Sequence, residues 1–369
     1  MNELDFEHII ENIKEDVDTP LVEGDIRNTI SFICRCEKNR APVRYLLSGL
    51  IAKINDNTID LHKPYVSMGT HSYPGRTLDE GIVQHIIHKY HLPCNSTTAF
   101  LTPAFRTVEE PLTKEWFNTC RPAEVYHKMM DVIEYVESRP DQATPVLSEI
   151  IRILLLQQIE NGNRLMQLQA VINDGEGDAT LSCEEIVNIL NLHLKCQRSS
   201  RLPVLMISAM YETLSEITNE NHKPLLSHNA ADSQTGSLGD IEIIIGEDDR
   251  VVTCYEVKKR AVTFDDVDVC LKKLSEGGIK VDNYLIVTTE EIDKELEKYV
   301  LPIYREIGIE VAILDCIGFV RHLLHFFTRY RMKFIDNYQQ LVLDEPDSSV
   351  SQPLKEAFLS IRRVAESEE

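Results

Sequence analysis

Residues 239–260, GDIEIIIGEDDRVVTCYEVKKR, decide the fold of the second half of the chain. The β-branched run IEIII is followed by the turn residues EDDR and by a second β-rich run, VVTCYEV. This is the pattern of two antiparallel strands joined by a tight turn. The turn is centred near Asp248 and Asp249. The stretch therefore predicts a β-hairpin.

One end of this hairpin brings charged residues together. Pairing about the turn places Asp240 opposite Val257, between Glu256 and Lys258. Successive side chains of a strand point to opposite faces, so Glu256 and Lys258 share one face. An acidic residue and a Glu-x-Lys pair are therefore predicted to converge at this end of the hairpin.

Such a convergence has a chemical use. Two carboxylates held close together repel each other, and a hard divalent cation between them allows both to stay ionised. A Mg²⁺ held by Asp240 and Glu256 keeps open positions for a phosphate oxygen and for water. Lys258 beside it is suited to orient or help deprotonate that water and to stabilise charge on phosphorus. The residues predict phosphodiester hydrolysis. The alternative is a chance recurrence of an acidic residue, a hairpin and E-x-K, because strand edges are often charged.

Asp240 followed after a hairpin by Glu256-Val257-Lys258 resembles the PD-(D/E)xK nuclease superfamily, with Gly-Asp in place of Pro-Asp. The resemblance implies that Asp240, Glu256 and the backbone carbonyl of Val257 bind Mg²⁺, that double-stranded DNA is the substrate, and that no nucleotide cofactor is used. In many members an acidic residue on the helix before the sheet joins the metal site. Glu212 is the candidate here, with Glu216 one turn later as its rival.

The segments after the hairpin extend the resemblance. The sequence predicts a helix over residues 265–275, buried strands over 283–289 and 309–315 with an amphipathic segment between them, and one long helix over 318–342. This order predicts an α/β sandwich. The resemblance implies a restriction-endonuclease-like mixed β-sheet flanked by helices, of the α+β or α/β class, preceded by a mainly helical N-terminal domain.

The composition bounds the number of domains and the compartment. At 369 residues and 43% hydrophobic residues, the chain can fill two cores of ordinary domain size. No stretch is long and apolar enough to span a bilayer, and the N-terminus is acidic rather than signal-like, which predicts a soluble cytoplasmic protein. The nine cysteines form no C-x-x-C pair and are interpreted as reduced thiols.

The net charge of −22 argues against non-specific DNA binding, because proteins that coat DNA usually carry a basic face. A DNA enzyme with this balance must concentrate its positive charge in one cleft and use metal ions, which favours a sequence-specific enzyme. The alternative is an acidic surface that serves solubility alone.

Two domains and a C-terminal tail are predicted along the chain. Residues 1–173 form a mainly helical DNA-recognition domain, residues 174–345 form the nuclease domain, and residues 346–369 form an acidic tail with a short helix. The boundary segment, NDGEGDATLSCEE, has the acidic spacing of a calcium-binding loop, but Ala179 stands where that loop requires Gly. A polar linker that ends in a capping box from Ser182 to Glu185 is the preferred interpretation.

Several polar side chains are candidates for DNA contact. In the loop at residues 66–81, Pro74-Gly75 predicts a turn, and Thr77 with Glu80 predicts a capping box that opens the next helix. Further candidates come from the loop at residues 96–107, from the loop before Asp240, and from the residues after the motif. The candidate DNA-contacting residues are Tyr73, Arg76, Arg106, Asp232, Ser233, Gln234, Thr235, Lys259 and Arg260. Each loop is equally compatible with an ordinary connection.

The layout of GRTLDE and FLTPAFR ahead of DSQTGSLGDIEI and YEVKKR is similar to type II restriction endonucleases of the SacI kind. This resemblance implies cleavage at a short, palindromic site and a homodimer with two symmetry-related active sites. The alternatives are a repair, transposon-end or modification-dependent nuclease on the same core, and a DNA-binding or partner-binding module that uses the fold without catalysis.

Overall fold

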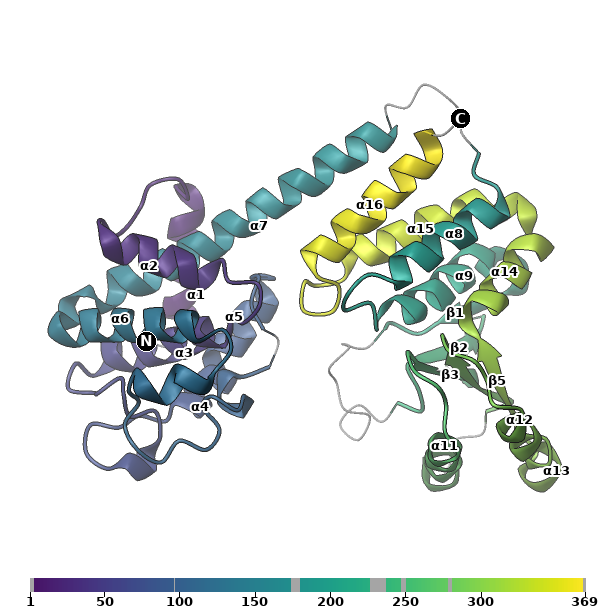
Figure 1. Ribbon diagram of the computed structural model, residues 1–369, viewed down its shortest axis with the longest axis horizontal. Coiled ribbons are helices and arrows are strands. Elements are labelled where there is room, and N and C mark those ends of the chain that lie inside the picture. The colour runs from purple at the N-terminus through teal and green to yellow at the C-terminus, as the bar shows by residue number, and fades with distance from the viewer. Residues whose placement is uncertain are drawn as a thin grey trace. The chain divides into compact units, whose positions relative to one another are not determined.

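The computed structural model describes residues 3–95, 97–173, 180–225, 237–246, 250–277 and 281–367. The chain forms two compact units, Met1–Arg164 and Leu165–Glu369 (Figure 1). The division lies inside a long helix, at Arg164 rather than at residue 173, and the predicted acidic tail belongs to the second unit. Among the described residues, no helix has the length and apolar character needed to cross a bilayer.

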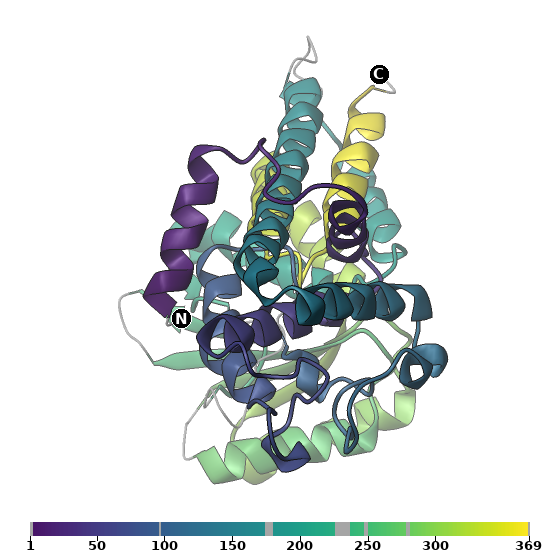
Figure 2. The same ribbon diagram turned by 90° about the vertical axis from the view of Figure 1, so that its left-hand side faces the viewer.

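The described residues of the first unit form helices and no strand (Figure 2). Helix α3 is mostly apolar and is buried from Ala41 to Lys53, so it runs through the core of this unit. The α-helices are α1 Glu3–Glu15, α2 Asp25–Cys34, α3 Ala41–Asn55, α4 Gly75–Leu78, α5 Gln84–Lys89, α6 Ala123–Ser138 and α7 Ala143–Asn173. The last of these continues past the division into the second unit.

The second unit contains a mixed β-sheet, as the sequence predicts, and this sheet has five strands. Its strands are β1 Glu220–His222, β2 Ile241–Ile245, β3 Val251–Lys258, β4 Asn283–Thr288 and β5 Glu310–Asp315, in this spatial order. Strand β2 is antiparallel to both of its neighbours, β1 and β3, whereas β3, β4 and β5 are parallel. The short edge strand β1 was not predicted, because its sequence, ENH, has no strand signal.

Helices cover both faces of this sheet (Figure 1). One core contains Tyr255 of β3 and residues of α8 Cys183–Leu194, α9 Leu202–Thr218, α14 Cys316–Phe326, α15 Arg331–Asp344 and α16 Gln352–Ser367. The other contains Cys254 of β3 and residues of α11 Phe264–Gly277, α12 Lys294–Val300 and α13 Ile303–Ile307. Alternate residues of β3 therefore face different helical layers.

The register of the hairpin differs from the expected one by one residue. Ile241 pairs with Tyr255, and a bulge shifts the ladder between Ile243 and Ile244. Continuing this ladder by one residue places Asp240 beside Glu256 rather than opposite Val257. The pair of Ile244 with Val251 beside the turn is displaced by two residues from the expected register, and the bulge, which adds one residue to β3, reduces this difference to one.

The C-terminal helices also differ from the expectation. The predicted long helix is broken into α14 and α15 by a short 3₁₀ turn at Thr328–Tyr330. The final helix, α16, buries Leu354, Phe358 and Leu359 in the core of the second unit, so the predicted tail is part of that fold. The capping box predicted at the start of α8 is confirmed: Ser182 and Glu185 exchange backbone and side-chain hydrogen bonds of 2.6 and 3.2 Å.

Candidate active site

The turn before β2 holds Asp240 against β3. Glu242 accepts hydrogen bonds from the Leu238 amide at 2.8 Å and from the Ser237 hydroxyl at 2.9 Å, and thereby fixes the approach to the strand. The exposed Asp240 carboxylate accepts a hydrogen bond of 2.7 Å from the backbone amide of Val257. The first acidic residue of the motif is thus tied directly to the strand that carries the other two.

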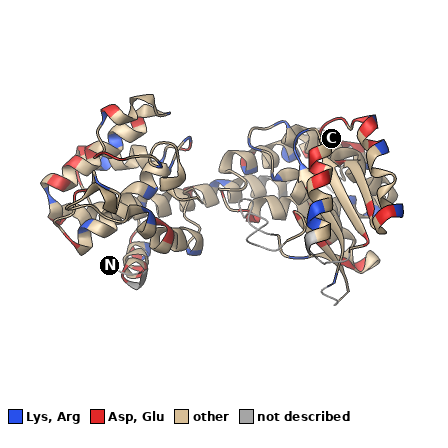
Figure 3. Ribbon diagram, turned by 90° about the horizontal axis from the view of Figure 1, so that it is seen from below, with Lys and Arg blue, Asp and Glu red and all other residues tan. Residues whose placement is uncertain are grey.

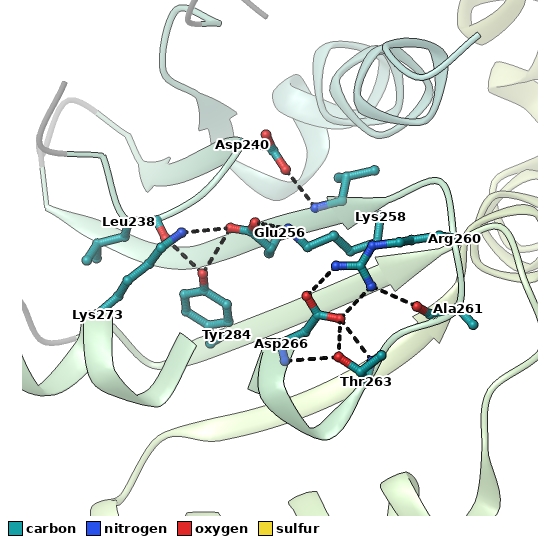
Figure 4. A network of polar contacts seen from close by, with 11 residues as sticks. Leu238, Asp240, Glu256, Lys258, Arg260, Ala261, Thr263, Asp266, Lys273 and Tyr284 are labelled. Atoms are coloured by element: carbon teal, nitrogen blue, oxygen red, sulfur yellow. Dashed lines mark hydrogen bonds and ion pairs between the residues drawn. The ribbon is translucent and has the colours of Figure 1, made fainter. Parts of the chain in front are cut away.

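Glu256 lies at the centre of a charged cluster (Figure 4). Its side chain points to the layer of α11, because Cys254, two residues earlier in β3, faces that layer. Glu256 is 8% exposed. The Lys258 ammonium donates to its Oε1 at 2.5 Å, and the Lys273 ammonium of α11 donates to its Oε2 at 3.2 Å. A carboxylate this buried is stabilised by such partners.

Tyr284 of β4 completes the surroundings of Glu256. Its hydroxyl lies 2.8 Å from the Leu238 carbonyl oxygen and 3.3 Å from Glu256 Oε2. Burial raises the pKa of Tyr284, so the hydroxyl stays protonated and acts as a donor. The same residue thereby contacts both the turn before Asp240 and the carboxylate of Glu256.

The charge on Lys258 is reinforced by its surroundings. Burial alone would lower its pKa, but the hydrogen bond to Glu256 and the negative charges of Glu256, Asp240 and Asp266 raise the pKa above its usual value. Lys258 is therefore a firmly protonated ammonium beside two carboxylates. In this state it stabilises negative charge and does not accept a proton.

The cluster suits a hard cation by its chemistry. Asp240 and Glu256 present carboxylate oxygens at the ends of adjacent strands, and oxygen donors are the ligands that Mg²⁺ prefers. The carboxylate of Glu256 already attracts two ammonium groups, which shows that this position stabilises positive charge. The donor set therefore fits a divalent cation in competition with the lysines.

The two cationic residues that follow the motif already have partners. Arg260 forms a bidentate ion pair with Asp266, with distances of 2.6 and 2.7 Å, at the start of α11. Lys259 points to the opposite face of the sheet, where its ammonium donates to the Ser199 hydroxyl. Both side chains are exposed, but they extend from different faces.

The structure does not bring Glu212 to the cluster. Glu212 lies on α9, which packs on the Tyr255 face of the sheet, whereas Glu256 points to the other face. Its carboxylate lies 3.1 Å from Nε2 of His222 on β1. The expectation that Glu212 joins the metal site assumed that α9 approaches the strand ends, and this helix instead covers one sheet face.

Tyr73, in the first unit, cannot contact DNA in this structure, because its side chain is fully buried. Its ring fills space left by Gly49, where an added Cβ would lie 2.9 Å from the Tyr73 hydroxyl. The exposed Arg76 forms an ion pair of 2.8 Å with Glu80. Arg106 is exposed, and no hydrogen bond or ion pair of its side chain is seen among the residues that the structure describes.

The predicted capping box of Thr77 and Glu80 is wrong. Helix α4 begins three residues earlier than this box implies, with Pro74 rather than Thr77 at the N-cap, and no side chain caps it. The residue that fixes this segment is Asp79, whose buried carboxylate accepts hydrogen bonds from the Arg44 guanidinium, the Thr98 hydroxyl and the Ala99 amide. Phe100 and Phe105 of the second loop are likewise buried, so GRTLDE and FLTPAFR build the core here.

Some predicted residues lie outside the described part of the chain. These are Asp232, Ser233, Gln234 and Thr235, the turn residues Asp248 and Asp249, and most of the acidic segment at the predicted boundary, including Ala179. Their expected roles stay predictions.

Among the described residues, one other group has the composition of a metal site: Asp60, His62 and Glu137. The negative charges of its two carboxylates are already balanced by hydrogen-bond donors of the protein. Glu137 accepts hydrogen bonds from the Lys53 ammonium and the Leu61 amide, both at 2.7 Å. Asp60 contacts the His62 ring at 2.7 Å. This pattern is that of a polar network in which protein cations balance the acids.

Acidic and basic residues are interspersed along the helices of both units in the view of Figure 3. At the cluster, two positive charges come together, because Lys258 and Lys273 both contact Glu256. The carboxylates of Glu256 and Asp240 balance these two ammonium groups.

Sequence reasoning missed Lys273 and Tyr284. Tyr284 lies in a strand that the sequence predicts, two residues before Ile286, which pairs with Glu256. Alternation along β4 would place it on the Glu256 face once the strand register was known. Lys273 belongs to a predicted helix, but only the packing of α11 on the sheet shows that it points to Glu256.

Comparisons with known proteins add no assignment. No protein-family model matches the chain, and no curated protein is significantly similar to it.

Proposed function

We propose that this protein is a Mg²⁺-dependent endonuclease of the PD-(D/E)xK type that cuts double-stranded DNA at a short specific sequence, as type II restriction endonucleases do. The observation that carries the proposal is the contact of 2.5 Å between Lys258 and Glu256 beside an Asp240 that is anchored to the same strand. The cluster unites two carboxylates and a protonated lysine, a set that suits metal-assisted phosphodiester hydrolysis.

Each residue has a distinct role in this proposal. Asp240, Glu256 and the carbonyl of Val257 hold the cation, which supplies Lewis-acid activation of the phosphate and of water. Lys258, firmly protonated, stabilises the negative charge that develops on the phosphoryl oxygens. The Val257 amide keeps the Asp240 carboxylate in place. Tyr284 and Lys273 keep the Glu256 carboxylate oriented.

Sequence specificity is supported by the charge of the chain. With a net charge of −22, general attraction to the phosphate backbone is weak, so productive binding must come from defined contacts. A palindromic site cut on both strands would be served by a homodimer with two such clusters. We include this dimer in the proposal.

The proposal is tested by digesting unmethylated phage DNA with the wild type and with Lys258→Ala and Glu256→Gln, in Mg²⁺ and in EDTA. We expect discrete fragments with the wild type in Mg²⁺ alone, and a loss of at least about a hundredfold in rate for each variant. Lys298→Ala is the control, because this lysine of α12 is 68% exposed and pairs with a neighbouring surface glutamate. It should cut like the wild type.

The outcome also separates the alternatives. Cleavage only of methylated or otherwise modified DNA would favour a modification-dependent nuclease. Folded protein that cuts no DNA with Mg²⁺ or Mn²⁺ would refute the nuclease proposal and favour a binding module, in which the ion pairs around Glu256 are purely structural.

A further inference from the structure

The two lysines at Glu256 bind different oxygens of one carboxylate. Lys258 donates to Oε1, whereas Lys273 donates to Oε2, which the Tyr284 hydroxyl also approaches at 3.3 Å. The two cations reach it from different elements, β3 and α11 (Figure 4). Only the first of them belongs to the Glu-x-Lys motif.

A single lysine cannot serve both Glu256 and the substrate. In the structure Lys258 is bound to Glu256, whereas its proposed role is on the phosphate, so catalysis requires it to leave Oε1. Glu256 is 8% exposed, and an uncompensated buried carboxylate is strongly destabilising. A second positive group that stays on Oε2 resolves this conflict, and Lys273 occupies that position.

We infer that Lys273 is a positioning residue: it holds Glu256 through Oε2 while Oε1 is exchanged from Lys258 to the divalent cation, and its own charge limits how tightly that cation binds. The inference rests on the proposed function. It gives Lys273 two opposed effects. Its hydrogen bond orients the carboxylate and so favours reaction, whereas its ammonium repels a second cation close by.

These opposed effects give the inference a distinctive signature. In Lys273→Met the repulsion is lost, so the Glu256 site should bind a divalent cation about three- to tenfold more tightly. The orientation of Glu256 is lost as well, and Lys258 remains as its only ammonium partner among those described here, so cleavage at saturating cation should be about tenfold slower or more. A variant that merely damaged the fold would weaken both binding and cleavage.

The experiment measures Mn²⁺ binding to the full-length protein by calorimetry, with Glu256→Gln identifying the binding that belongs to this site. Single-turnover cleavage in saturating Mn²⁺ is followed in parallel. Lys273→Arg keeps the charge and the donor and should stay within about threefold of the wild type in both measurements. Lys272→Met, an exposed neighbour on the same helix, should change neither.

Three outcomes are decisive. Tighter Mn²⁺ binding with slower cleavage in Lys273→Met supports the inference. Unchanged or weaker binding in this variant, or no Mn²⁺ binding that depends on Glu256, overturns it even if the wild type cuts DNA. Tighter binding in Lys273→Met together with a wild type that cuts no DNA supports the role of Lys273 at the cation site and refutes the nuclease proposal alone.

Discussion

Gly239 lies directly against the backbone of Tyr255: a Cβ at position 239 would stand 2.6 Å from the Tyr255 carbonyl oxygen and 3.1 Å from its carbonyl carbon. Real Cβ atoms do not approach backbone this closely, so any other residue would push the turn away from β3. The contact leaves room only for glycine immediately before Asp240. It also sets the position of Asp240 relative to Glu256.

We therefore expect Gly239→Ala to displace Asp240 and to destabilise the second unit by about 1–3 kcal/mol, as overpacking against backbone does. Thermal denaturation and the DNA cleavage assay measure the two effects, and cleavage should fall at least about tenfold. Gly162→Ala is the control, because an added Cβ there meets nothing within 4 Å inside helix α7. It should be neutral or stabilising by up to about 1 kcal/mol. Wild-type cleavage by Gly239→Ala would show that this contact does not position Asp240.

The strands and the order of elements around the motif were predictable because their patterns are local. β3, β4 and β5 are β-branched, apolar runs, and the helices between them have apolar residues at helical spacing. The bulge between Ile243 and Ile244 was not predictable, because nothing in the residues of IEIII distinguishes a bulged ladder from a regular one. The register beyond the bulge was wrong by one residue, because the pair of Ile244 with Val251 beside the turn is itself displaced from the expected one.

For the DNA-contact candidates of the first unit, the sequence did not predict which side chains are buried. Tyr73 stands in a loop rich in turn residues, which favours an exposed position, but Gly49 on α3 leaves space for its ring in the core. Asp79 is charged and was overlooked, although it is fully buried against Arg44. Burial of this kind depends on residues distant in sequence, which local periodicity does not report.

The buried pair of Arg44 and Asp79 gives a test of that core. Asp79→Asn leaves a fully buried guanidinium without its counter-charge, which should destabilise the first unit by about 3–5 kcal/mol. Glu80→Gln next to it breaks an exposed pair with Arg76 and should change stability by less than about 1 kcal/mol. Urea denaturation of both variants compares them. Equal stability would contradict the structural role assigned to Asp79.

The buried His193 predicts a dependence of stability on pH. Its Nε2 lies 3.0 Å from the Leu354 carbonyl oxygen and must donate, so Nδ1 accepts from the Tyr338 hydroxyl at 2.9 Å and the ring is neutral. Burial lowers the pKa of His193 to about 4. In the unfolded chain the pKa is about 6.5.

Between these two pKa values the unfolded chain binds a proton at His193 and the folded state does not. His193 therefore has little effect on the free energy of unfolding well above pH 6.5 and lowers it as the pH falls towards 4. From pH 7 to pH 5 the free energy of unfolding should fall by about 2 kcal/mol because of His193. His193→Gln cannot titrate, and it should lose that much less stability than the wild type over this interval in urea denaturation. The same loss in both proteins would mean that His193 is not the residue responsible.

Glu212 gives a last test. As a metal ligand, the role expected from the sequence, it would be needed for cleavage, whereas as a partner of His222 it would affect only stability. In the structure the His222 ring lies 2.7 Å through Nδ1 from the Lys223 carbonyl oxygen and 3.1 Å through Nε2 from Glu212, and the protonated ring can donate to both. Burial lowers the pKa of His222, but the bonds to Glu212 and Lys223 outweigh this and raise it above its usual value.

A raised pKa stabilises the folded state at low pH, and this contribution is lost as the pH rises through the folded value. Glu212→Gln should therefore lower the pKa of His222 in an NMR titration and reduce stability at pH 6 by less than about 1 kcal/mol, with little change at pH 9, because Glu212 is partly exposed. DNA cleavage should stay within about twofold of the wild type, since Glu212 lies on the other face of the sheet from Glu256. If Glu212→Gln abolished cleavage without changing stability, Glu212 would belong to the active site, and α9 would have to move towards Asp240 when DNA binds.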